Sequence, residues 1–351
     1  MKSKFISLLA STVMILFLLF VLLMTFMATA QCASPTIKET RITTSSTAWS
    51  PTIYGNIIVW QDKRNGIDDI YMYNLCTKKE TRITNTGSAS SPNVYGDKIV
   101  WDDSKNFNTY MYDLSTQKET QISTNGGLYP AIYSDRIVYQ AIRTSAFNIF
   151  LYNISTHKET QITNCGSGEY AGTPAIYGDR IVYQSYRNGK NDIYMYNFST
   201  HKETQITSTG LAAYSPKIYG DKMVWVDTSN GWNKLNLYMY DLSNNKETKI
   251  VTNASDSVLS ATIYDDRVVW GDARRGKSII RMYNISTNMI INITCGRSSD
   301  EPNIYGDRVV WRDYRHGGND IYMATLINPP ITACSASFPR EKKTVNRQIH
   351  R

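Results

Sequence analysis

The stretch that decides the fold is residues 177–207, YGDRIVYQSYRNGKNDIYMYNFSTHKETQIT. It opens with a tight Gly-Asp turn, followed by an apolar run that ends in Tyr183. An aromatic-rich segment, residues 192–197, and a charged segment, residues 202–207, come next. Short runs with strong strand preference, separated by turn sequences, predict antiparallel β-strands. A further strand should precede the turn, because Pro174 opens an apolar segment and proline is tolerated at a strand start.

The same pattern recurs throughout the chain. An Ile-Tyr-Gly phrase or a close variant begins at Ile53, Val94, Ile132, Ile176, Ile218, Ile263 and Ile304. Successive copies are 38 to 45 residues apart. Seven units of this length, each with four short strands, are typical of a β-propeller. We therefore predict an all-β fold, a seven-bladed β-propeller of four-stranded blades, in place of the two domains that 351 residues could otherwise hold.

The second strand of every unit is an apolar run that ends in a large aromatic residue. These residues are Trp60, Trp101, Tyr139, Tyr183, Trp225, Trp270 and Trp311. Because the position stays aromatic in all seven units, we expect it to fill the packing between neighbouring blades. The alternative is that these seven aromatic residues form a stripe that binds a ligand.

The strand count is uneven at the two ends of the repeat array. The seventh unit has no charged fourth strand after it, whereas a spare copy of that strand, residues 38–43, precedes the first unit. We predict that this N-terminal strand joins the last blade beside residues 321–326 and closes the ring. Closure removes exposed sheet edges. The propeller should then span residues 36–326.

The N-terminus has the form of a secretory signal. Lys2 and Lys4 precede an apolar run, residues 5–30, that ends in Ala-Thr-Ala. Residues 1–30 are therefore predicted to be a signal peptide, or an uncleaved anchor in a membrane, since the run could span a bilayer. Either way, we expect the body to be exported to the cell surface or beyond. Lipidation of Cys32 is disfavoured, because Gln31 precedes it.

Export gives two sets of residues a candidate role. Five Asn-x-Ser/Thr sequons are candidate glycosylation sites: Asn153, Asn197, Asn253, Asn284 and Asn292. A role in turns is the alternative, because asparagine favours turns and aspartate replaces it in other units. Among the five cysteines, Cys32 and Cys334 flank the closing blade and are a candidate disulfide.

The formal net charge of +8 belongs mostly to the chain ends. The N-terminal segment carries +2 and residues 327–351 carry +4, which leaves +2 for the body. No concentrated stripe of Lys and Arg with interleaved aromatics marks the body, so we expect no nucleic-acid partner. The basic tail, residues 327–351, is predicted to be disordered.

The repeat of residues 177–207 resembles the TolB-like propeller repeats of archaeal, methanogen-type cell-surface proteins. The resemblance covers residues 36–326 and all seven copies. It implies a secreted or surface-attached propeller without assigned catalysis; TolB itself is an envelope scaffold that binds other proteins. No sign of TolB's extra α/β domain is found, so its partners do not transfer. Residues 328–330 look like the start of a linker to a polycystic-kidney-disease (PKD)-type domain, of which the tail would be a remnant.

The sequence shows no catalytic or metal-binding constellation. The four histidines are spread over the chain, and His157 and His201 occupy the same turn of different units. We therefore expect no metal site and no cofactor. An Asp-x-Arg motif recurs in three units, at Asp62, Asp272 and Asp313. A structural Asp–Arg pair is favoured over a calcium loop, because an arginine occupies the middle of each motif.

Departures from the repeat mark the candidate binding site. In this connectivity, the loops between second and third strands and the loops between units share one end of the ring, here called the top face. Aromatic residues and one glutamate are unevenly placed there: Trp49, Tyr129, Glu169, Tyr170, Tyr186, Tyr214 and Trp232. Aromatics with a few polar groups suit stacking against a glycan or a protein hot spot.

These observations favour a non-catalytic, monomeric propeller that acts as a protein- or glycan-binding or structural module of the envelope. The alternative is a carbohydrate-active enzyme, either a polysaccharide lyase or a glycosidase. A glycosidase needs two opposed carboxylates, and no spacing pairs Glu169 with Glu301, the other glutamate expected in these loops. A TolB-like docking scaffold for an envelope protein is the third reading.

Overall fold

The computed structural model describes residues 36–143, 145–208, 213–228, 235–251, 258–274, 277–296 and 298–327. Two compact units divide the chain, Met1–Thr36 and Ile37–Arg351, and every described residue except Thr36 belongs to the second. The predicted signal or anchor, Cys32, Cys334 and the tail beyond Ile327 lie outside the described residues. Among the residues that are described, none forms a helix long and apolar enough to cross a membrane.

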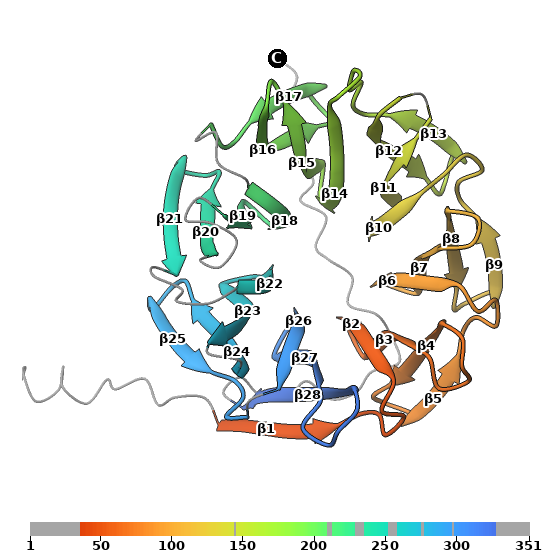
Figure 1. Cartoon of the computed structure of the whole chain (residues 1–351), viewed down its shortest axis with the longest axis vertical. Coiled ribbons are helices and arrows are strands. Elements are labelled where there is room, and N and C mark those ends of the chain that lie inside the picture. The colour runs from red at the N-terminus through yellow and green to blue at the C-terminus, as the bar shows by residue number, and fades with distance from the viewer. Residues whose placement is uncertain are drawn as a thin grey trace, which may run out of the picture. The chain divides into compact units, whose positions relative to one another are not determined.

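Seven four-stranded antiparallel sheets stand around a central axis and form a seven-bladed β-propeller (Figure 1). The innermost strands are β2 (Ala48–Tyr54), β6 (Ala89–Tyr95), β10 (Leu128–Tyr133), β14 (Tyr170–Tyr177), β18 (Ala213–Tyr219), β22 (Val258–Tyr264) and β26 (Ser299–Tyr305). The second strands are β3 (Ile57–Asp62), β7 (Lys98–Asp103), β11 (Arg136–Ile142), β15 (Arg180–Arg187), β19 (Lys222–Asp227), β23 (Arg267–Arg274) and β27 (Arg308–Asp313).

The outer half of each blade holds the aromatic and charged strands. The third strands are β4 (Asp69–Asn74), β8 (Asn108–Asp113), β12 (Phe147–Asn153), β16 (Lys190–Asn197), β20 (Asn236–Asp241), β24 (Lys277–Asn284) and β28 (Asp320–Ile327). The outermost strands are β5 (Lys79–Arg82), β9 (Lys118–Gln121), β13 (Lys158–Gln161), β17 (Lys202–Gln205), β21 (Lys246–Val251), β25 (Met289–Asn292) and β1 (Thr36–Arg41).

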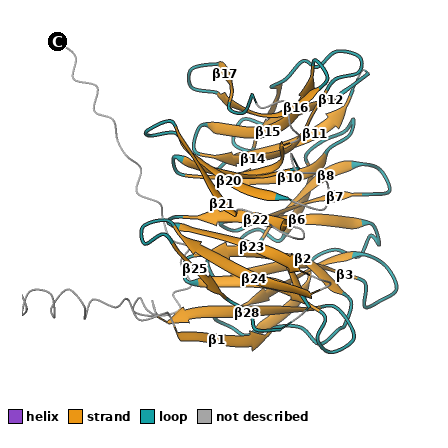
Figure 2. Cartoon of the chain, turned by 60° about the vertical axis from the view of Figure 1, so that its left-hand side comes forward, coloured by secondary structure: helices purple, strands orange, loops and turns teal. Residues whose placement is uncertain are grey.

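The N-terminal strand closes the ring, as predicted. The last blade has the order β1-β28-β27-β26, and Figures 1 and 2 show β1 beside β28. The contacts that hold β1 repeat those inside a continuous blade. Arg41 forms an ion pair of 2.5 Å with Asp320, and the Thr43 hydroxyl donates to the same carboxylate at 3.0 Å. In the first blade, Arg82 and Thr84 bind Asp69 at 2.5 and 2.9 Å.

The aromatic residues that end the second strands are core residues, which confirms the packing interpretation. All seven have at most 2% of their surface exposed. Trp60, for example, lies in a cluster that joins Ala48 and Ile53 of the first blade to Val310 and Ile321 of the last blade. Each blade therefore buries its aromatic residue against a neighbour, which is why the second strand needs no polar face.

Two of the three Asp-x-Arg motifs are ion pairs, whereas in the third Asp272 pairs with Arg281 at 2.9 Å and the Arg274 side chain lies outside the described residues. Arg64 binds Asp62 at 2.7 Å, and Arg315 binds Asp313 at 2.6 Å. Each arginine also reaches an outer-strand glutamate, Glu80 or Glu39, at 2.5 Å. The guanidinium thus ties the loop after the second strand to the outermost strand. The predicted structural pair is confirmed in these two blades.

Candidate functional site

The candidate aromatics lie in strands rather than in the predicted top-face loops. Trp49, Tyr129, Tyr170 and Tyr214 belong to the first two residues of innermost strands, and Tyr186 belongs to β15. The innermost strands carry a bulge at their shared proline position, and pairing continues beyond it. In β2 the register shifts between Trp49 and Thr52, and Trp49 is still paired with Gln61. The side chains are therefore held by sheet geometry at the top face.

Three of the candidates come together between the fourth and fifth blades. Tyr170 and Tyr186 are directly paired across β14 and β15, and their rings stack at 5.8 Å with an angle of 9°. Burial raises the pKa of the Tyr170 hydroxyl, and the nearby Tyr214 and Tyr186 add to this effect. Tyr186 is 37% exposed. We call Tyr170, Tyr186 and Tyr214 the tyrosine cluster.

A buried amide without a partner extends the tyrosine cluster. Asn191 of β16 is paired directly with Tyr186, so the two side chains share one face of the sheet. Asn191 is 6% exposed, yet neither its amide oxygen nor its amide nitrogen has a hydrogen-bond partner in the structure. A buried amide without partners costs about 1–3 kcal/mol, so Asn191 lowers the stability of the fourth blade.

A glutamine holds the two blades together beside the cluster. Gln184 lies two residues before Tyr186, on the same face of β15, and its carbonyl accepts a bond of 3.2 Å from the Ser215 amide of β18. Similar links join the preceding blades, from Thr173 to Gln140 at 2.8 Å and from Tyr129 to Asp102 at 2.9 Å. Ser215 follows Tyr214 directly, so the link fixes the backbone that carries Tyr214.

The opposite face of the fourth blade lines a separate pocket of about 320 Å³. Its lining residues are Ile162, Thr163, Asn164, Glu169, Arg187, Tyr196, His201 and Glu203. Arg187 forms an ion pair of 2.7 Å with Glu203. This contact lowers the pKa of the Glu203 carboxyl, although burial of the carboxyl acts in the opposite direction. Glu169 accepts a bond of 3.1 Å from the Gly166 amide. Arg–Glu pairs of this kind recur in other blades, so Glu203 has a structural role here.

The remaining candidates are dispersed. Trp49 and Tyr129 lie on the first and third blades, outside the tyrosine cluster, and Tyr129 is 51% exposed. Trp232 lies outside the described residues. Glu301 lies in β26, where its carboxylate accepts a bond of 2.8 Å from the Ser50 amide and lies 3.4 Å from Arg312. Glu301 therefore bridges the last and first blades.

The sequons differ in their surroundings. The amide oxygens of Asn153, Asn197 and Asn284 accept bonds of 2.8 to 2.9 Å from the backbone of the turn that follows. Asn292 is exposed on the outer strand β25, and Asn253 lies outside the described residues. The turn bonds account for three of the five asparagines without a sugar.

Sequence reasoning missed Asn191, Gln184 and Arg187. Comparing equivalent positions of the seven units marks Gln184 and Arg187 as polar residues that follow the buried aromatic. Nothing in the spacing marks Asn191, because its lack of a partner is a property of the packed sheet. In the described part of the chain, no three His, Cys, Asp or Glu side chains are placed to hold a metal ion.

Comparison with known proteins supports the fold alone. No protein-family model and no curated protein matches this chain. It is similar in structure to an oligogalacturonate lyase in complex with manganese, with 14% identity, coverage of 84% of this chain and 94% of that one, and a TM-score of 0.64. It is also similar to the β-propeller domain of the trilobed protease from Pyrococcus furiosus, with 14% identity, coverage of 84% of this chain and 100% of that one, and a TM-score of 0.62. TolB from Acinetobacter baumannii shares 18% identity, with coverage of 67% of this chain and 62% of that one, and a TM-score of 0.52. The chain thus has a TolB-like β-propeller fold.

Proposed function

We propose that this chain is an exported, non-catalytic propeller that binds a saccharide of the cell envelope through the tyrosine cluster. The observation that carries the proposal is the tyrosine cluster, in which the rings of Tyr170 and Tyr186 stack at the top face. Two stacked phenol rings, of which that of Tyr186 is 37% exposed, offer an apolar face to a sugar ring, and their hydroxyls offer donors and acceptors for its hydroxyl groups.

Binding should depend on the exposed ring of the tyrosine cluster. A glycan array identifies a saccharide, and calorimetric titration then measures its affinity. We expect Tyr186→Ala to weaken binding about tenfold or more, as loss of a central aromatic contact does. Tyr129→Ala is the matched control, because Tyr129 is a still more exposed top-face tyrosine outside the cluster. Equal losses in the two variants would contradict a site at Tyr186.

The buried amide of Asn191, directly below the tyrosine cluster, should affect stability and not binding. Asn191→Leu removes two unpartnered polar atoms, so its free energy of unfolding should equal or exceed that of the wild type. Saccharide affinity should change by less than about twofold, because both amide atoms are buried below the surface. Denaturant unfolding and titration on the same sample check both parts. A destabilised variant, or a loss of affinity of about tenfold, would show that the amide has a partner that the structure does not contain.

A protein partner is the second form of the binding hypothesis. A TolB-like propeller fold and aromatic residues at the top face both suit docking of an envelope protein. Surface cross-linking followed by mass spectrometry separates the two forms. Cross-links from the fourth and fifth blades to one protein, with no glycan bound on the array, would favour the docking scaffold.

A carbohydrate-active enzyme is favoured by one observation, the presence of Glu169 and Glu203 in one pocket. A propeller neighbour is an oligogalacturonate lyase, at 14% identity. The engagement of Glu203 by Arg187 argues against a free pair of carboxylates. Assays for newly formed reducing or unsaturated sugar ends decide the matter. Turnover that Glu169→Gln abolishes would establish the enzyme.

Export is part of the proposal and rests on the N-terminal sequence. Lys2, Lys4 and the apolar run of residues 5–30 have the form of a signal or anchor. Fractionation of cells and the intact mass of the mature protein test it. A full-length chain in the cytoplasm would contradict it.

A further inference from the structure

A closed ring of seven tyrosines surrounds the propeller axis. Each innermost strand ends in one of them: Tyr54, Tyr95, Tyr133, Tyr177, Tyr219, Tyr264 and Tyr305. Every neighbouring pair is in contact, with ring centroids 4.5 to 5.0 Å apart and angles of 43° to 55°. The Tyr219 hydroxyl is hydrogen-bonded to those of Tyr177 and Tyr264. The axis is thus lined at this level by a belt of phenols.

The residues two positions before the tyrosines form the next layer. Side chains two apart on a strand point to the same side, so this layer lies against the tyrosine ring. Its members are Thr52, Asn93, Ala131, Ala175, Lys217, Thr262 and Asn303. Six of the seven are uncharged. Lys217 is therefore the one cation of the layer, and its flanking counterparts in the neighbouring blades are Ala175 and Thr262.

Lys217 has no counter-charge within the described residues. Its side chain is partly buried, and burial without an ion pair lowers the pKa of its ammonium group. Two other lysines do have a carboxylate nearby: Lys98 lies 2.6 Å from Asp97, and Lys222 of the same blade lies 3.9 Å from Asp241. The acidic groups of the innermost strand β26 are also engaged, because Asp300 is held at 2.6 Å by Arg312 and Glu301 accepts from Ser50.

We infer that Lys217 and the neutral donors of its layer form an anion-binding site on the propeller axis, which takes the carboxylate group of a small ligand. The layer offers one positive charge and several neutral donors, namely hydroxyls and the amides of Asn93 and Asn303. One cation with neutral donors balances a monoanion and leaves a dianionic phosphate undercompensated. This site is separate from the tyrosine cluster, and neither depends on the other.

The ammonium of Lys217 itself reports on the site. Reductive methylation with ¹³C-formaldehyde gives each lysine an NMR signal, and the signal absent from Lys217→Met identifies Lys217. Sodium acetate is added at constant ionic strength against chloride. We expect a saturable shift of the Lys217 signal at about 1–10 mM acetate, and a rise in the pKa of Lys217, because a bound anion favours the charged amine. Sodium phosphate should bind about tenfold more weakly.

Two variants and a second carboxylate complete the test. Lys217→Met should remove saturable acetate binding in calorimetry, whereas Lys217→Arg, which keeps the charge, and Lys222→Met should retain it. Glucuronate in place of acetate distinguishes a sugar acid from a free small acid by its relative affinity. Binding that survives in Lys217→Met, or no saturable shift up to about 100 mM acetate, would overturn the inference.

Discussion

Deletion of residues 36–43 should lower the free energy of unfolding more than any single substitution in this chain, by over about 5 kcal/mol. The deletion removes β1 and leaves the edge of β28 unpaired. It also strips the buried Asp320 carboxylate of Arg41 and Thr43. The Ile321 amide, which donates to the Thr43 hydroxyl at 2.9 Å, loses its acceptor as well. Denaturant unfolding of the full chain and of the deletion variant measures the effect.

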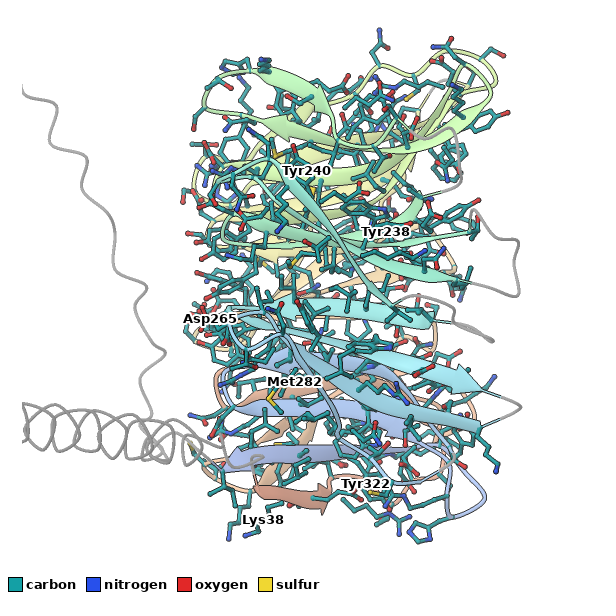
Figure 3. The ribbon with its side chains drawn as sticks, turned by 90° about the vertical axis from the view of Figure 1, so that its left-hand side faces the viewer. Lys38, Tyr238, Tyr240, Asp265, Met282 and Tyr322 are labelled. Carbon is teal, nitrogen blue, oxygen red and sulfur yellow. The ribbon has the colours of Figure 1, made fainter. Side chains whose placement is uncertain are left out.

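Single substitutions in and after β1 distinguish the loss of ring closure from the effect of shortening the chain. Thr43→Val should cost about 1–3 kcal/mol, because it leaves buried polar groups of β28 without partners. Lys38→Ala is the control, since Lys38 lies exposed on β1 at the outer edge of the last blade (Figure 3). A deletion variant that unfolds at the wild-type denaturant concentration would contradict closure by β1.

Trp60→Ala should destabilise the propeller by about 3–5 kcal/mol, the range for truncating a fully buried tryptophan. Trp60 fills the contact between the first and last blades and stacks on Tyr71 at 6.2 Å. Its indole nitrogen also donates to Asp62 at 3.1 Å. The substitution leaves a cavity at the seam where the ring closes. Thermal and denaturant unfolding, monitored by circular dichroism, measure the loss.

The control for this substitution is an aromatic residue without core contacts. Tyr129→Ala removes a side chain that is 51% exposed and should change the free energy of unfolding by no more than about 0.5 kcal/mol. If Trp60→Ala and Tyr129→Ala melt alike, the packing role assigned to the seven buried aromatics is wrong.

The repeat made the fold predictable in detail. Its period identified the blades, and the spare strand before Ile53 identified the closure. The strand ends were less accurate: residues 38–43 and 79–84 were expected as strands, whereas β1 and β5 end at Arg41 and Arg82. The reason is physical. In the first blade, Thr84 leaves the strand ladder because its hydroxyl accepts from the Ile70 amide and donates to Asp69.

The candidate site was predictable only in part. Uneven aromatics identified Tyr170, Tyr186 and Tyr214 individually, but their proximity follows from strand register and from blade packing. Register likewise places Asn191 beside Tyr186, and no sequence pattern shows that its amide lacks a partner. Lys217 could have been found by comparing equivalent positions, because it is the one charged residue in its layer.

The central claim, that the tyrosine cluster is the binding surface, is tested most directly by mapping a bound saccharide onto the tyrosines. Selective ¹³C labelling of tyrosine rings gives each phenol an NMR signal, which single Tyr→Phe variants assign. Titration with the saccharide selected on the array should shift the signals of Tyr170, Tyr186 and Tyr214 saturably and leave Tyr129 unchanged. Saturable shifts confined to Tyr129 or to the axial ring, with the tyrosine cluster unaffected, would contradict the proposed site.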